Sequence, residues 1–162
     1  MTGAAEELAV TIGTIMGAGD GIPYSALSIV RAGGQVEQFN VEVHPRALQW
    51  SSTNTNTLET ESFDPSEMVH HYGESSRLLT VERVPGTFPD HIKLAFPASL
   101  PIWGRYHDEY HPVSVEVSEG QRVILLRHQK DEALFASLSV DWESKRATRL
   151  VTESCLLQLR AV

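Results

Sequence analysis

Cysteine is almost absent from this sequence, because Cys155 is the only one in 162 residues. A lone cysteine excludes an intramolecular disulfide framework and a cysteine-rich zinc site, and it is typical of a protein that folds in a reducing compartment. Cys155 shares one face of a strand-like run with Leu157 and Leu159, which favours a buried structural thiol over a nucleophile. We expect no metal and no cofactor.

Positive charge is also scarce. Lysine and arginine number 13 against 21 aspartate and glutamate residues, which gives a formal net charge of -8. The basic residues are spread along the chain, so neither a nucleic acid nor an anionic membrane is expected as a partner. No apolar run approaches the roughly 20 residues of a membrane span, and the N-terminus has glutamates where a secretory signal needs basic residues. These features predict a cytoplasmic protein.

Aromatic residues are few, at 7% of the chain. Trp50, Trp103 and Trp142 fall at the ends of predicted strands or in connections, and they form no regular stripe. We interpret these three tryptophans as candidate binding residues at a rim or an interface, with packing in the core as the alternative.

The residues that are present indicate a single β-rich domain over 1–162. Hydrophobic residues make up 41% of the chain, and their dominant period is two. Two strand-like runs flank Ala32-Gly33-Gly34, which predicts a hairpin over 24–43. We expect an antiparallel β-barrel or β-sandwich. Further strands are predicted at 7–16, 77–84, 91–96, 112–117, 121–127, 133–140, 146–152 and 154–161.

Three segments suggest other local structure. "DPSEMVHHYG" predicts one short helix near 65–72, because Asp64 can cap it, Pro65 suits its first position and Gly73 can end it. "SSTNTNT" (51–57) has the short polar side chains of a loop. The proline-rich run 88–103 predicts an edge element or an arm that lies on a neighbouring subunit.

The segment "YHDEYHP" (106–112) is the strongest candidate site. If alternation from the valines at 113, 115 and 117 extends backwards, His107, Glu109 and His111 lie on the buried face, and Tyr106 and Tyr110 point outward. Residues four apart on a strand are roughly 13 Å apart, so His107 and His111 could not share a metal without a bulge. The segment is interpreted as a polar turn or edge, with an acid/base pocket or a metal site as alternatives.

Three functions fit these observations. The first is a non-catalytic binding or assembly module that associates with itself or with a protein partner, because no catalytic motif is complete. The second is a cofactor-independent barrel enzyme of the cyclase, isomerase or hydrolase type, acting on a small-molecule ligand. In that enzyme His107, Glu109 and His111 would be the acid/base groups, with Tyr106 or Tyr110 as hydrogen-bond donors. The third is an acidic inhibitor or immunity-type protein with one carboxylate-rich face.

Overall fold

Eleven β-strands of the described chain pair in one antiparallel sheet. The computed structural model describes residues 3–17, 20–66, 69–74, 77–82 and 88–162. Within these residues the strands are β1 (Tyr24–Ala32), β2 (Gln35–His44), β3 (Gln49–Asn54), β4 (Thr60–Asp64), β5 (Val69–Glu74), β6 (Arg77–Glu82), β7 (Tyr110–Ser118), β8 (Gln121–His128), β9 (Phe135–Asp141), β10 (Arg146–Val151) and β11 (Cys155–Ala161).

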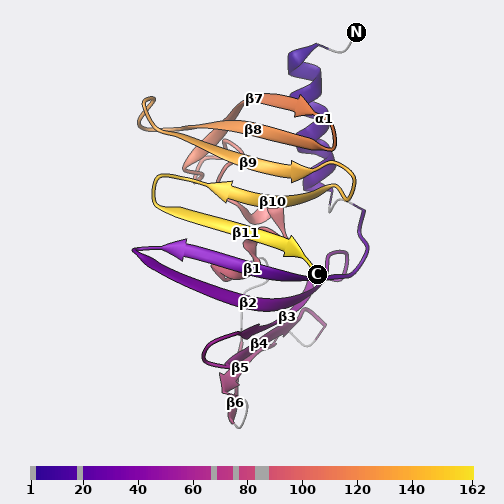
Figure 1. The fold of residues 1–162 in the computed structure, drawn as a ribbon, viewed down its shortest axis with the longest axis vertical. Helices are drawn as coiled ribbons and strands as arrows, with labels where there is room; N and C mark the ends of the chain where they lie inside the picture. Colours follow the sequence, from indigo (N-terminus) through magenta and orange to yellow (C-terminus); the bar gives the residue numbers. More distant parts are fainter. Residues whose placement is uncertain (1–2, 18–19, 67–68, 75–76, 83–87) are drawn as a thin grey trace.

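The strand order shows an open sheet. The order is β6-β5-β4-β3-β2-β1-β11-β10-β9-β8-β7, and β6 and β7 stand at its opposite ends (Figure 1). β11 pairs with β1 in the middle, so the last strand of the chain lies beside the first. The predicted mainly antiparallel β class is confirmed, in the form of one sheet that stays open among the described strands.

The hairpin predicted over 24–43 is confirmed. β1 pairs with β2 from Tyr24 opposite Val43 to Ala32 opposite Gln35. Gly33 and Gly34 form the turn with φ angles of 57° and 78°, which only glycine adopts without steric cost.

The strand predicted at 7–16 is wrong, because helix α1 occupies Ala4–Met16. The β-branched residues in this stretch suggested a strand. However, Leu8, Thr11, Ile12 and Ile15 repeat at the spacing of one helix face, and all four are buried or half-buried. Two glutamates in the first turn add a favourable interaction with the helix dipole. Helical spacing therefore outweighs β propensity here.

The helix predicted near 65–72 is also wrong, because β5 begins at Val69 and pairs with both β4 and β6. Asp64 does act as a cap, since its Oδ1 accepts hydrogen bonds from the backbone N–H and the hydroxyl of Ser66. The same Asx geometry begins helices and turns, and here it begins the turn between β4 and β5. Residues 67–68 of the predicted helix lie outside the described residues.

The loop predicted at 51–57 is wrong over its first half, where β3 runs to Asn54. Ser52 and Asn54 are buried on one face of β3. The Asn54 side chain accepts hydrogen bonds from the backbone N–H groups of Asn56 and Thr57, which fixes the following turn. The short polar side chains of this stretch therefore belong to a strand whose buried face is partly polar.

One face of the sheet, here called the inner face, carries the core. Its strands contribute buried apolar side chains that alternate with more exposed ones, as in β9, where Ala136, Leu138 and Val140 are buried. The segment 88–103 lies against this face and adds its own buried residues, among them Ile92, Leu100 and Ile102.

The segment 88–103 is thus neither an edge nor an arm. It contains helix α2 (Asp90–Lys93), where a strand was predicted at 91–96, and the short helix η1 (Pro97–Ser99). The prolines make a central strand unfavourable in this segment. They still allow the segment to pack, as irregular backbone and short helices, against the inner face of the sheet.

Helix α1 runs past the ends of β7 to β10 (Figure 1), and Arg122 of β8 binds its side chains there. An Arg122 Nη atom donates to Thr11 Oγ1 at 2.7 Å and lies 3.1 Å from a Glu7 carboxylate oxygen. The guanidinium also packs 3.6 Å from the ring centre of Trp142. Among the described residues, no helix is long and apolar enough to cross a membrane.

Candidate functional site

The segment "YHDEYHP" begins in the loop before β7 and ends in the first three residues of that strand. Tyr106 is 94% exposed, and His107 and Glu109 are also exposed. His111 is half-buried, whereas Tyr110 is only 2% exposed and belongs to the core. The structure therefore does not bring His107, Glu109 and His111 together on a buried face.

The predicted parity is wrong because β7 is irregular. Its pairing with β8 shifts between Pro112 and Ser114, so one extra residue enters the ladder at this point. A bulge of this kind reverses which face every preceding residue occupies. Tyr110 consequently points inward, and Val113 is 38% exposed.

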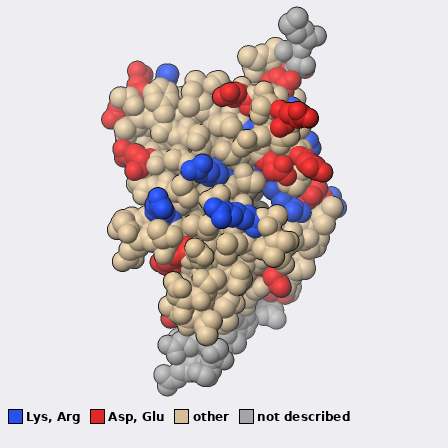
Figure 2. Space-filling model, in the orientation of Figure 1, with Lys and Arg blue, Asp and Glu red and all other residues tan. Residues whose placement is uncertain are grey.

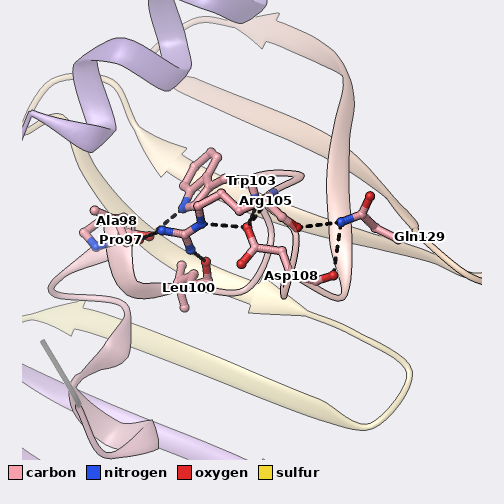
Figure 3. A network of polar contacts seen from close by, with 7 residues as sticks. All are labelled: Pro97, Ala98, Leu100, Trp103, Arg105, Asp108 and Gln129. Atoms are coloured by element: carbon pink, nitrogen blue, oxygen red, sulfur yellow. Dashed lines mark hydrogen bonds and ion pairs between the residues drawn. The ribbon is translucent and has the colours of Figure 1, made fainter.

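Asp108 is the organising residue of the loop (Figure 3). Its Oδ2 accepts hydrogen bonds from the backbone N–H groups of Trp103 and Arg105, at 3.0 and 3.1 Å, and from Arg105 Nε at 2.8 Å. The Asp108 side chain is 7% exposed. Arg105 in turn donates to the carbonyl oxygens of Ala98 and Leu100, which ties the loop to η1.

The hydrogen bonds keep the Asp108 carboxylate charged. Burial alone raises the pKa of this carboxyl, but the hydrogen bonds and the positive charge of Arg105, together with the N–H of Trp103, outweigh burial. The net result is a pKa below the ordinary value of an aspartate. Asp108 therefore acts as a structural anion.

A polar cleft of about 780 Å³ lies between this loop and the turns after β8 and β10. Tyr110 is in its wall and meets the His128 ring edge to face, with ring centres 5.1 Å apart. Burial raises the pKa of Tyr110, and the charges of Glu153 and Glu109 raise it further. His128 Nδ1 accepts hydrogen bonds from two backbone N–H groups. Among the described residues no group of three or more ligating side chains could hold a metal.

The three tryptophans contribute packing and hydrogen bonding. Trp50 is 2% exposed and lies edge-on to His91. Trp103 Nε1 donates to the Pro97 carbonyl oxygen at 2.8 Å (Figure 3). Trp142 packs against the charged ends of Arg122 and Lys145. Their role as binding residues stays a prediction.

Sequence reasoning missed the part that His91 plays in the interior. The imidazole stacks on Phe39 at 3.9 Å between ring centres, and its Nε2 lies 3.0 Å from Ser52 Oγ and 3.1 Å from a Glu61 oxygen. Both polar neighbours contact the same nitrogen, whereas a catalytic triad uses the two ring nitrogens separately. Together with the hydrogen bond from Ser28 to its carbonyl oxygen, these contacts hold α2 on the inner face.

An apolar groove lies beside α1 and has a volume of about 350 Å³. Its walls are Ile15 and Met16 of α1, Pro45 and Leu48 of the β2–β3 turn, Phe88, the 95–99 run, and Arg105. Met16 and Leu48 are 37% and 46% exposed. Of the lining residues that the structure describes, Arg105 is the charged one, and its Nε and both Nη atoms already donate to Asp108, Ala98 and Leu100.

Leu48 holds an unusual backbone conformation in this groove. Its φ is 53°, in the left-handed region that favours glycine or asparagine. Because Leu48 is half-exposed and its backbone is in a sterically disfavoured region, it contributes little to the stability of the fold. It does add apolar surface to the groove.

No protein-family model and no curated protein matches the chain. An uncharacterized conserved protein from Thermus thermophilus superimposes with a TM-score of 0.54 at 12% identity, over 98% of this chain and 87% of that chain. MucB, in a complex with MucA, gives 0.49 at 8% identity, over 96% of this chain and 53% of MucB. LprF from Mycobacterium bovis gives 0.47 at 9% identity, over 98% and 94%. The Thermus protein shares the fold of this chain.

Proposed function

We propose that the protein is a non-catalytic binding module that holds a single apolar chain in the groove beside α1. The supporting observation is the groove itself. Among the described residues its lining is apolar apart from Ser99 and Arg105, and Met16 and Leu48 keep apolar surface exposed to water there. Binding of an apolar ligand would remove this surface from water, and the burial of apolar surface is favourable.

The size of the groove limits the ligand. Ligand pockets commonly measure about 300–1,000 Å³, and 350 Å³ is near the lower end of that range. One unbranched hydrocarbon chain or a small apolar molecule fits this volume. The guanidinium of Arg105 is held by its three acceptors, so the ligand is recognised mainly by shape and apolar contact.

The enzyme hypothesis has less support from the geometry. It requires His107, Glu109 and His111 to converge on a pocket, whereas His107 and Glu109 are exposed in the wall of the polar cleft and His111 does not line that cleft. The buried residue of the segment is Tyr110, next to His128. Self-association and cytoplasmic localisation stay predictions.

The test is a titration with phenylnaphthylamine, an apolar dye whose fluorescence rises in apolar surroundings, followed by displacement with decanol. We compare Leu48→Asn with Leu58→Asn. Leu58 is a matched control, because it is 58% exposed, has a φ of 61° and also lies in a hairpin turn, but it is not in the groove wall. Asparagine tolerates the left-handed region at both positions.

We expect the wild-type protein and Leu58→Asn to bind the dye equally. Leu48→Asn removes the exposed half of one leucine from the contact, worth about 1 kcal/mol or about fivefold in affinity. Equal weakening in both variants, or no saturable binding by the wild-type protein, contradicts the proposal.

A further inference from the structure

The outer face of the sheet carries three exposed arginines on neighbouring strands: Arg31 of β1, Arg149 of β10 and Arg160 of β11. The register places them on one face. Arg149 pairs with Gln158, and Arg160 follows Gln158 by two residues. Arg31 pairs with Leu156, which precedes Gln158 by two residues. Alternate residues of a strand share a face, so all three arginines point away from the core.

Figure 2 shows how charged side chains are distributed on the side of the molecule that Figure 1 presents. Lysine and arginine side chains gather near the middle of the sheet face that Figure 1 presents, and aspartate and glutamate lie mostly toward its margins. This is the reverse of the carboxylate-rich face that an acidic inhibitor would need. In a chain of net charge -8, three arginines on one face form a local exception.

Within the part of the chain that the structure describes, none of the ion pairs involves Arg31, Arg149 or Arg160. Diagonal neighbours on adjacent strands are about 7–8 Å apart, so Arg149 and Arg160 can contact one partner segment together. A guanidinium is suited to this task, because it binds a carboxylate through two parallel hydrogen bonds.

Apolar surface lies between the arginines. Leu27, Ile29 and Leu156 are half-buried on the same face. Arg31 and Leu156 also line a hollow of about 500 Å³, whose wall includes Val36, which is 47% exposed, and one carboxylate, Glu153. An apolar centre with arginines around it is typical of a protein interface.

We propose that this outer face binds an acidic segment of another protein, with an apolar side chain in the hollow and carboxylates on the three arginines. A second copy of the chain is disfavoured, because a two-fold contact of this face would bring arginine against arginine. Nucleic acids and anionic membranes offer no apolar side chain for the hollow, and their dense phosphate charge meets a chain of net charge -8. The groove beside α1 plays no part in this inference.

The experiment measures fluorescence anisotropy of a labelled peptide of alternating glutamate and leucine. A peptide with glutamine in place of glutamate is the neutral control. The protein variants are Arg149→Glu and Lys130→Glu, which change the net charge equally. Lys130 is exposed in the turn after β8 and is not on the outer face. Arg160→Gln is a second, milder variant, and thermal melting checks that each variant is folded.

We expect the wild-type protein to bind the glutamate peptide, and to bind the glutamine peptide with an affinity about tenfold or more lower. The affinity of Arg149→Glu for the glutamate peptide should also be about tenfold or more below that of the wild type. Arg160→Gln should weaken it less, and Lys130→Glu should leave it within about twofold. Equal loss in Arg149→Glu and Lys130→Glu would show a response to net charge alone and overturn the proposal. Absence of binding to the glutamate peptide would also overturn the proposal. The same holds if Arg149 instead supports binding to single-stranded DNA or to phosphatidylserine vesicles, or self-association measured by sedimentation.

Discussion

Replacing Asp108 with asparagine should destabilise the protein far more than its place in an exposed loop suggests. The Asp108 carboxylate accepts three hydrogen bonds, and its side chain is 7% exposed. A hydrogen bond to a charged group contributes about 1.5–3 kcal/mol, against about 1 kcal/mol for a neutral pair. Loss of the charge from three such bonds that share one acceptor therefore costs on the order of 2–3 kcal/mol.

Asp90→Asn is the matched control. Asp90 and Lys93 form an ion pair with the same i,i+3 spacing as Arg105 and Asp108, but the Asp90 side chain is 58% exposed. Exposed pairs contribute about 0.3–0.5 kcal/mol. Thermal unfolding at neutral pH should thus separate the two variants, with Tm lowered by about 4–12 °C in Asp108→Asn and by about 2 °C or less in Asp90→Asn.

The pH dependence gives a second reading of the same carboxylate. The folded pKa of Asp108 lies below its unfolded value of about 3.9, so its contribution to stability is present above that pH and is lost as pH falls through the folded pKa. The free energy of unfolding of Asp108→Asn, measured from pH 5 downward, should therefore fall less steeply than that of the wild type. Equal Tm losses in the two variants, or parallel pH curves for wild type and Asp108→Asn, would refute this reasoning.

Three further outcomes are expected. Arg122→Gln should release α1 and speed hydrogen exchange of its amides, and unchanged exchange would contradict the role of Arg122 as its fastener. Gly104→Ala should lower Tm more than Gly33→Ala in thermal melts, because both glycines have positive φ but only at position 104 would a Cβ meet a fixed atom, the His111 Cβ at 3.1 Å. Burial raises the pKa of Tyr24 to about 12 against the pull of Arg146, so stability should fall between about pH 10 and pH 12 in the wild type and less in Tyr24→Phe, as urea unfolding would show.

The predictable parts of the fold are those that depend on local pattern. The 24–43 hairpin and the strands from β7 to β11 follow from alternation and turn glycines, and the structure confirms them. Predictions from local sequence pattern were wrong where the same pattern is compatible with two structures. Asp64 caps a turn as readily as a helix, and the β-branched residues of α1 concealed a helical spacing.

The candidate sites depend on contacts that sequence order does not reveal. The groove joins Ile15, Leu48 and Phe96 from three separate elements. The outer arginines become neighbours only through the pairing of β11 with both β1 and β10. For "YHDEYHP", a single bulge after Pro112 was enough to reverse the predicted faces.

Methyl NMR during a titration with decanol tests the proposed function most directly. Met16, Ile15 and Leu48 lie in the groove, whereas Leu125 is 38% exposed on β8 and has no place in it. Saturable shifts of the Met16, Ile15 and Leu48 methyl signals, with Leu125 unchanged, are the predicted result. Shifts spread evenly over exposed methyl groups, or no saturation at any of them, would contradict a binding groove beside α1.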